Sequence, residues 1–271
     1  MCLIVIAYQQ HSRYPLVVAA NRDEFYARPT APAGFWEARP DLLAGCDLLG
    51  GGTWLGITRS GRFAAVTNYR EPGETRRDAP SRGQLVTDYL CSGDAPLDYL
   101  QEISGRGADY NGYNLIAGSP GSMAWYSNRG GDPRELESGV YGVSNHLLDT
   151  PWPKVERGKA GVMAILGGGE PDPEALLRML ADRTLAGDDA LPDTGVGRNW
   201  ERALSPMFIS SDNYGTRSST VLTVYTRRRV RFAERSYAPG GLAPETVALE
   251  FPLEAGDAAS VSASGAKAGR I

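Results

Sequence analysis

Residues 2–8 read CLIVIAY and residues 15–21 read PLVVAAN, with the polar residues 11–14 between them. Two apolar runs of strand length joined by a short polar turn predict a β-hairpin. If the turn is centred near Ser12, Cys2 lies opposite Arg22, within one residue. The hairpin then brings the polar end of its second strand, Asn21-Arg22-Asp23-Glu24, to the N-terminus of the chain.

Cys2 follows the initiator methionine directly. If Met1 is removed, Cys2 carries a thiol and a free α-amine on one residue. An α-amine has a pKa of about 7.7–8.0, so it can act as a general base near neutral pH. An N-terminal amine that activates its own side-chain nucleophile is a known catalytic arrangement. The alternative is that Cys2 is a small buried residue of an edge strand, because free cysteine is often buried.

The composition is that of an ordinary globular protein. The chain has 271 residues, of which 42% are hydrophobic and 22% charged, which allows one large domain or two small ones. The net charge of −4 gives no indication of a nucleic-acid partner. We therefore expect no nucleic acid among its partners, and the sequence does not indicate an oligomeric state.

Cysteine and histidine usage argues against a metal site. The chain has 3 cysteines, at unrelated spacings, and 2 histidines, which is neither a disulfide framework nor a metal motif. A secretory signal is not evident, and no apolar run approaches the length of a membrane span. We therefore expect no metal, no integral membrane segment and a cytoplasmic location.

The next part of the chain predicts a loop and a second hairpin. Residues 28–52 are rich in proline and glycine and predict a long loop, whose three final glycines lack the Lys-Ser/Thr of a phosphate loop. Residues 53–59 and 62–68 flank Ser60-Gly61, a good hairpin turn. This register places Asn68 at the open end of the hairpin, opposite Thr53.

The remaining elements predict the fold class. Helical spacing occurs over residues 82–104, with a break near Ser92-Gly93, and over 153–168 and 173–183, whereas 188–203 resembles a loop. Strands are predicted at 113–117, 123–127, 139–144, 207–210, 216–226, 229–235 and 246–251. Without a repeated βαβ unit, this order predicts an α+β fold, a four-layer α-β-β-α sandwich of two mostly antiparallel sheets. We expect one domain over residues 2–253 and a disordered tail over 254–271, which has few large apolar groups.

Several blocks of the sequence resemble one known family. They are Met1-Cys2, Asn21-Arg22-Asp23-Glu24, Gly51-Gly52-Thr53-Trp54-Leu55-Gly56, Asn111-Gly112-Tyr113-Asn114-Leu115, Ser144-Asn145-His146 with Pro151-Trp152-Pro153-Lys154, and Tyr214-Gly215-Thr216-Arg217-Ser218-Ser219-Thr220. Together they resemble the NRDE family, the homologues of Transport and Golgi organisation protein 2. The resemblance runs in order from residue 1 to about residue 253 and leaves out only the tail.

That family in turn resembles the N-terminal nucleophile (Ntn) hydrolases, in particular the choloylglycine hydrolase and penicillin V acylase branch, which cleaves amide bonds with a processed N-terminal cysteine. The resemblance implies a set of catalytic residues. These are Cys2 as nucleophile, Asp23 and, with a different local spacing, Arg22 after the second strand, the two asparagines Asn68 and Asn145, and Arg217 as the late arginine.

The chemistry of such a site gives each residue a role. The Cys2 thiol attacks a carbonyl, the α-amine takes and returns protons, and Asp23 orients the amine. Either Arg22 or Arg217 lowers the thiol pKa, because a nearby cation stabilises a thiolate. Asn68 donates to a developing oxyanion, and Asn145 fixes the substrate or the amine. The substrate-binding residues are expected to include Asn21, Glu24, Trp54 and His146.

Two functions follow as expectations. The first is a hydrolase of a non-peptide amide bond in a small amphiphilic molecule, which needs no cofactor. The second is a binder or carrier of haem or a lipid-like molecule in the same pocket, with Cys2, His146 or His11 as a haem ligand.

Overall fold

The computed structural model describes residues 2–238 and 243–254, so the predicted tail lies outside the described residues except for residue 254. Two antiparallel sheets form the centre of the molecule. In order across the first sheet, the strands are β10 (Gly139–Val143), β1 (Cys2–His11), β2 (Tyr14–Phe25), β11 (Tyr214–Tyr225), β12 (Arg229–Ser236) and β13 (Glu245–Pro252). Those of the second sheet are β3 (Thr30–Trp36), β4 (Arg39–Asp47), β5 (Leu55–Thr58), β6 (Phe63–Asn68), β7 (Tyr113–Ser119), β8 (Ser122–Ser127) and β9 (Arg134–Glu135).

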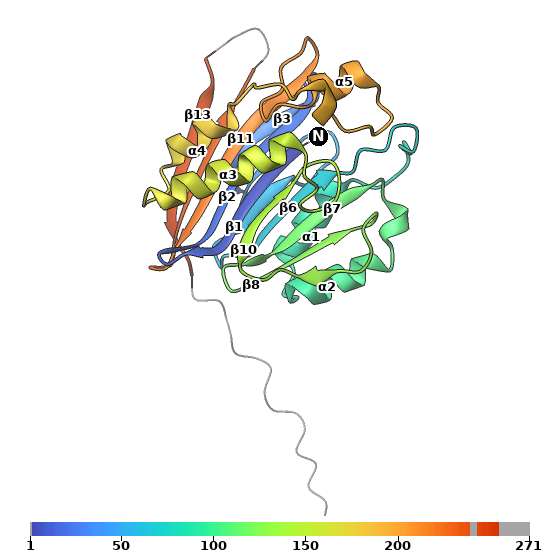
Figure 1. Cartoon of the computed structure of the whole chain (residues 1–271). Coiled ribbons are helices and arrows are strands. Elements are labelled where there is room, and N and C mark those ends of the chain that lie inside the picture. Colours follow the sequence, from blue (N-terminus) through green and yellow to red (C-terminus); the bar gives the residue numbers. More distant parts are fainter. Residues whose placement is uncertain (1, 239–242, 255–271) are drawn as a thin grey trace, which may run out of the picture.

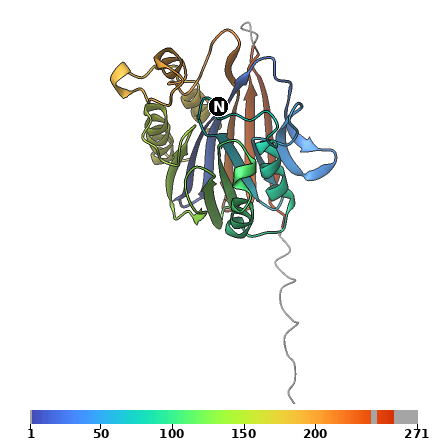
Figure 2. The same cartoon turned by 90° about the vertical axis from the view of Figure 1, so that its right-hand side faces the viewer.

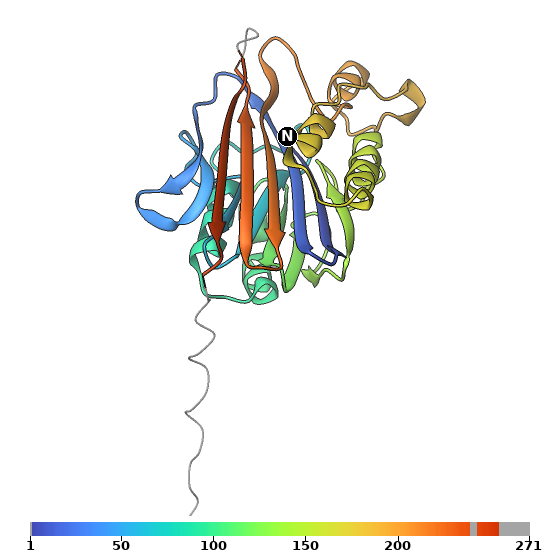
Figure 3. The ribbon, with the colours of Figure 1, turned by 90° about the vertical axis from the view of Figure 1, so that its left-hand side faces the viewer.

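Helices cover the outer face of each sheet. Helices α3 (Pro153–Gly167) and α4 (Pro173–Leu180) pack on the first sheet, and α1 (Arg82–Cys91) and α2 (Pro96–Ser104) pack on the second. The short helix α5 (Arg198–Ala203) and the 3-10 turns η1 (Gly107–Asp109) and η2 (Asp188–Ala190) complete the helical elements of the described residues. Figure 1 shows α3 in front of the strands with α4 beside it toward β11, and the side views in Figures 2 and 3 show these helices to one side of the strands.

The alternation of side chains along β1 explains the layering. Ile4 and Ile6 join the core between the sheets, whereas Leu3 and Val5 join the core beneath α3 and α4. A strand that is buried on both faces is apolar at every position, which is why CLIVIAY has no polar alternation. The predicted four-layer α-β-β-α sandwich is confirmed.

The first hairpin has the expected register. Cys2 pairs with Arg22 and Ile4 with Ala20 along β1 and β2. On the other side of β2, the pairing with β11 shifts between Thr216 and Ser218, so that Thr216 lies opposite Asp23 and Ser218 opposite Arg22. The intervening Arg217 is the extra residue of this bulge, which re-aims the side chains around it.

The loop predicted over residues 28–52 is wrong, because most of it forms the hairpin of β3 and β4. Prolines suggested a loop, but β3 is the edge strand of the second sheet, where a missing backbone donor is tolerated. The register of the β3–β4 pairing shifts at two places, between Ala31 and Gly34 and between Phe35 and Trp36.

Three smaller predictions also need correction. Residues 188–203 contain α5 and η2 rather than only loop, and residues 207–210 contribute a single bridge, Ser210 to Gly215, rather than a strand. The β5–β6 hairpin is closed by three residues instead of two, with Gly61 at a φ of 88°. Ile57 therefore pairs with Phe63, and Asn68 does not lie opposite Thr53.

Candidate functional site

A cavity of about 440 Å³ opens where β1 begins, and Cys2 lies in its wall. Of the predicted site residues, six line it: Cys2, Arg22, Asp23, Glu24, Trp54 and Asn68. The cavity wall is strongly polar. It contains five arginines, Arg22, Arg28, Arg76, Arg77 and Arg82, and three carboxylates, Asp23, Glu24 and Asp47.

Cys2 is held at this wall through its backbone. Its carbonyl accepts a hydrogen bond of 2.8 Å from the Ser144 hydroxyl, and the residue pairs with Arg22 along β2. Burial raises the pKa of the thiol, and the positive charge of Arg22 opposes this rise without overcoming it. Arg22 therefore acts on the thiol in the expected direction, although burial has the larger effect.

Asp23 is buried beneath Cys2 at the end of β2. Its Oδ1 accepts a hydrogen bond of 2.7 Å from the Thr216 hydroxyl, and its carbonyl accepts one of 3.1 Å from the Tyr214 hydroxyl. Burial raises the pKa of the Asp23 carboxyl, and nearby positive charges, Lys154 first among them, oppose this rise. The bulge in β11 is what brings Thr216 opposite Asp23.

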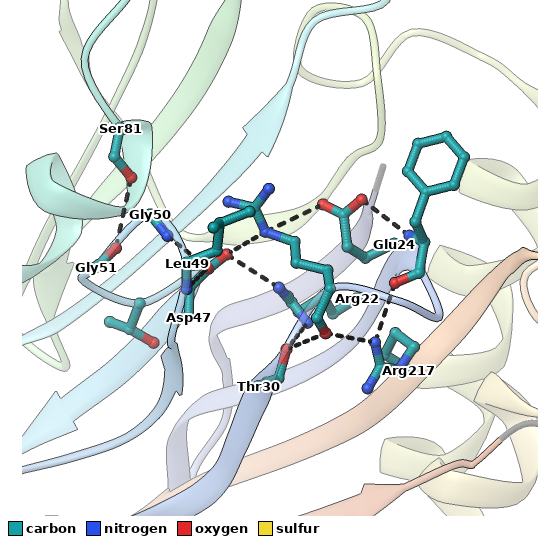
Figure 4. Close-up of polar contacts among 12 residues, drawn as sticks. Arg22, Glu24, Thr30, Asp47, Leu49, Gly50, Gly51, Ser81 and Arg217 are labelled. Carbon is teal, nitrogen blue, oxygen red and sulfur yellow. Dashed lines mark hydrogen bonds and ion pairs between the residues drawn. The ribbon is translucent and has the colours of Figure 1, made fainter.

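Arg22 is directed toward the second sheet, where it links three elements (Figure 4). Its guanidinium donates to the Thr30 hydroxyl at 2.9 Å and to the Asp47 carboxylate at 3.2 Å. It also stacks on the Trp54 ring, 4.2 Å from the ring centre. Because Arg22 is only 5% exposed, these contacts fix its position beside Cys2.

The two asparagines are neighbours, although only one lines the cavity. Asn145 is fully buried, and its side-chain amide donates to the Asn68 carbonyl at 3.0 Å. Its Oδ1 accepts a hydrogen bond from the Ser144 hydroxyl, which also donates to the Cys2 carbonyl. Asn145 therefore positions the residues around Cys2 from behind the cavity wall.

Besides Asn145, three predicted site residues lie outside the cavity. Arg217 donates through one nitrogen to the carbonyls of Phe25, Tyr26 and Arg28, and lines a separate cavity of about 130 Å³ behind Trp54. Asn21 is buried on the side of α4, where its amide donates to the carbonyls of Leu180 and Met207.

The third of these residues, His146, packs between Tyr69 and Trp152, and one ring nitrogen contacts the Thr150 hydroxyl at 2.8 Å. Burial lowers the pKa of His146, which favours the neutral ring.

The rim of the cavity is built around Asp47. Its carboxylate binds Arg28 at 2.7 Å and accepts hydrogen bonds from the backbone N–H groups of Leu49 and Gly50 (Figure 4). The chain then passes through Gly51 and Gly52, which have φ angles of 67° and 73°. These are left-handed conformations that favour glycine, so the glycine run shapes a tight turn at the cavity.

The sequence did not single out the buried lysine near the site. Lys154 lies in the first turn of α3, is 2% exposed and donates to the Leu204 carbonyl at 3.0 Å. Burial lowers the pKa of Lys154 to about 8, and the Asp23 carboxylate opposes this fall most strongly. A signal was present, because Lys154 continues the buried stripe of α3 through Gly158, Val162 and Leu166.

Comparison with known sequences places the chain in a family. The sequence model of the family described as Transport and Golgi organisation 2 matches residues 1–239. The chain belongs to this family. A bovine Transport and Golgi organization protein 2 homolog is 39% identical over 279 residues, which cover 94% of this chain and 100% of the relative. The human homolog is 36% identical over 276 residues with the same coverage, and the Drosophila melanogaster protein is 30% identical over 262 residues, covering 87% of this chain and 92% of its own.

Solved structures of similar shape are more distant. A variant of the conjugated bile acid hydrolase from Clostridium perfringens has 7% identity and a TM-score of 0.49, covering 94% of this chain and 98% of its own. A Caenorhabditis elegans ortholog of the N-acylethanolamine-hydrolyzing acid amidase has 11% identity and a TM-score of 0.44, covering 82% and 92%. Among the described residues, no helix combines the length and the apolar character that crossing a membrane requires.

Proposed function

We propose that this member of the Transport and Golgi organisation 2 family hydrolyses an acyl-amide bond, with Cys2 as its nucleophile after removal of Met1. The observation that carries the proposal is the position of Cys2. It lies in the wall of a large cavity, opposite Arg22, and the buried Asp23 lines the same cavity. The four-layer α-β-β-α architecture supports the same reading, since the sequence resembles hydrolases that use an N-terminal cysteine in this way.

The reaction balances with the residues present. The α-amine of Cys2 takes the thiol proton as sulfur bonds to the substrate carbonyl carbon. The Asn68 side chain donates to the oxyanion that forms, and a donor of this kind is worth about 2.7–4 kcal/mol. The C–N bond then breaks as the amine returns the proton to the leaving nitrogen. Water attacks the resulting thioester by the same route, which releases the acid and restores the thiol.

The substrate is expected to carry an anionic group. Five arginines and three carboxylates line the cavity, so its wall has an excess of positive charge. Arginine binds carboxylate and phosphate groups through paired hydrogen bonds. Arg77 is exposed at this wall. We propose an acyl amide whose head group is a carboxylate, sulfonate or phosphate.

The test is the hydrolysis of such amides by the mature protein. Intact mass first establishes that the chain begins at Cys2. Cys2→Ala is expected to abolish amide hydrolysis while the thermal unfolding midpoint stays close to that of the wild type. A protein that retains Met1, or a Cys2→Ala variant with unchanged activity, would exclude this mechanism.

Binding without catalysis is the competing function, and the cationic wall favours it. The same arginines fit the carboxylates of haem or of a lipid-like acid. Haem titration separates the two functions. A Soret shift that is lost in Cys2→Ala supports haem as a ligand, whereas hydrolysis without any shift supports the enzyme.

A further inference from the structure

The cavity at Cys2 contains more positive than negative side chains, with five arginines and three carboxylates in its wall. A guanidinium has five N–H donors and no acceptor. An arginine whose donors already bind protein groups has few left for a ligand. The protein contacts of each arginine therefore indicate which of them can bind an anion.

Arg22 and Arg28 share one carboxylate of this wall. Arg22 donates to Asp47 at 3.2 Å, and Arg28 binds the same carboxylate at 2.7 Å (Figure 4). The Nε of Arg28 also lies 3.9 Å from the Glu24 carboxylate. Both guanidinium groups therefore have acidic partners within the protein, and these partners oppose the binding of a further anion.

Two more arginines belong to the segment between β6 and α1. Arg76 is turned toward the backbone, because one of its side-chain nitrogens donates to the carbonyls of Ala108 and Asp109. Arg77 has no hydrogen bond or ion pair with a residue that the structure describes, but it is exposed. Water screens an exposed charge, so Arg77 attracts an anion only weakly.

Arg82, the first residue of α1, differs from the other four arginines. It is half-buried at the cavity wall, and one of its terminal nitrogens donates to the Gly112 carbonyl at 3.0 Å. Within the described part of the chain it has no other hydrogen bond and no ion pair. Most of its donors, and its charge, are therefore left for a ligand.

The position of Arg82 also disfavours a cation. The partial positive charge at the start of a helix repels a guanidinium, and the first turn of α1 contains no acidic residue. The fold therefore gains little from this charge. An anion in the cavity would balance what the protein leaves unbalanced.

Arg82 lies close to Asn68, the proposed donor to the oxyanion. The Gly112 carbonyl that binds Arg82 also accepts the backbone N–H of Tyr69 at 2.8 Å. Tyr69 directly follows Asn68, which lines the same cavity. A substrate anion on Arg82 would thus be held near the residue that meets the reacting carbonyl.

We propose that Arg82 binds the anionic group of the substrate and so selects anionic over neutral acyl amides. This inference rests on the proposed function, because it assigns a residue to the anion of that substrate. Arg82 keeps enough donors for a paired contact with a carboxylate, sulfonate or phosphate. Arg22 and Arg28 instead shape the wall through Asp47.

Binding of two matched amides tests this role without turnover. The probes are N-decanoylglycine, which ends in a carboxylate, and N-decanoylglycinamide, which ends in a neutral amide. Both are titrated calorimetrically at pH 7 into the mature Cys2→Ala protein, with and without a second substitution. Arg82→Met should weaken carboxylate binding about tenfold or more, and binding of the neutral probe by less than about twofold.

Arg77→Met is the comparison, since it removes an exposed arginine from the same wall and should weaken carboxylate binding less than Arg82→Met does. Arg82→Lys keeps the charge but loses the planar fork, so its affinity should lie between those of the parent and Arg82→Met. Equal losses for the two probes would overturn the proposal. So would a larger loss in Arg77→Met, or a parent protein that binds the carboxylate no more tightly than the neutral amide.

Folding is checked by urea unfolding of each variant. If Arg82→Met does not fold, Arg82→Gln takes its place in the titrations. Failure of both variants to fold would overturn the proposal, because Arg82 would then be needed for the structure itself.

Hydrolysis of the same two amides by the mature wild type separates this inference from the proposed function. In Arg82→Met, kcat/KM for the carboxylate should fall about tenfold or more, mainly through KM, whereas that for the neutral amide should hold. If neither amide is hydrolysed but carboxylate binding depends on Arg82, the proposed function fails and the anion site stands. If both are hydrolysed and Arg82→Met slows both equally, the proposed function stands and this inference fails.

Discussion

At the scale of single residues, several groups act on the Cys2 thiol. Burial raises its pKa most, the negative charge of Asp23 adds to the rise, and the guanidinium of Arg22 lowers the pKa by a smaller amount. The sequence left open whether Arg22 or Arg217 acts on the thiol. The structure brings Arg22 to the cavity and turns Arg217 toward three backbone carbonyls and a separate cavity.

We predict that Arg22→Met slows the alkylation of Cys2 by iodoacetamide between pH 7 and 9, because removal of a nearby cation raises the thiol pKa further. The rate is measured by mass spectrometry of the Cys2 peptide. Arg217→Met is the matched control and should leave the rate unchanged. A larger effect of Arg217→Met would show that Arg217, and not Arg22, is the arginine that lowers the thiol pKa.

Lys154 provides a second prediction, on stability against pH. Its pKa falls from 10.5 to about 8 on folding, so the unfolded chain holds more protons than the folded protein between these values. Stability therefore rises with pH over this interval. From pH 8 to 9.5 the contribution of this one group is about 2 kcal/mol, at 1.36 kcal/mol per pKa unit.

Urea unfolding at pH 8, 9 and 9.5 measures this dependence. The rise should be present in the wild type and absent from Lys154→Met. The comparison between the two proteins cancels the effect of the buried tyrosines, whose raised pKa values lower stability at still higher pH. Parallel curves for the two proteins would mean that Lys154 is not the group that titrates.

At the scale of elements, the cavity depends on how the turn after β4 meets α1. Gly52 lies against the backbone of Gly83, and a Cβ on Gly52 would come within 2.5 Å of it. The same contact also positions Thr53, because its backbone N–H donates to the Gly83 carbonyl at 3.2 Å. The turn therefore holds Asp47, which binds Arg22 and Arg28, close to the start of α1, where Arg82 lies.

We predict that Gly52→Ala destabilises the protein more than Gly51→Ala. Both positions have positive φ, and an L-residue there costs about 1–2 kcal/mol. A Cβ on Gly51 meets open space, whereas one on Gly52 meets helix backbone. Urea unfolding of both variants gives the comparison, and equal losses would show that the contact with α1 contributes nothing.

At the scale of the whole molecule, the largest apolar cluster of the described residues is the core between the two sheets. Leu222, in the middle of β11, is fully buried in this core together with residues of both sheets such as Ile6 and Phe63. Apolar side chains from strands that are distant in sequence meet here. The packing of the sheets thus supports the site at the end of β1 and β2.

We predict that Leu222→Ala lowers the free energy of unfolding by about 2–5 kcal/mol, the usual loss for a buried leucine. Leu185, which is 54% exposed, is the matched control. Leu185→Ala should change the free energy of unfolding by less than about 0.5 kcal/mol. Equal effects of the two substitutions would contradict this account of the core.

The sequence by itself determined the first hairpin, its register and the fold class, because these depend on local patterns. Two apolar runs and a polar turn put Cys2 opposite Arg22, as the structure confirms. Local pattern was insufficient where an edge strand tolerates proline, as in β3, and where a short helix such as α5 is held by a buried ion pair.

Only the tertiary structure decided which polar residues gather at Cys2. The bulge in β11 sends Arg217 away from the cavity and sets Thr216 on Asp23, and neither outcome can be read from residue spacing. Lys154 is buried near the first hairpin, although 131 positions of sequence separate it from Asp23, because α3 packs over β1. The hairpin at the N-terminus is local, whereas the charges that surround it come from segments that folding alone brings together.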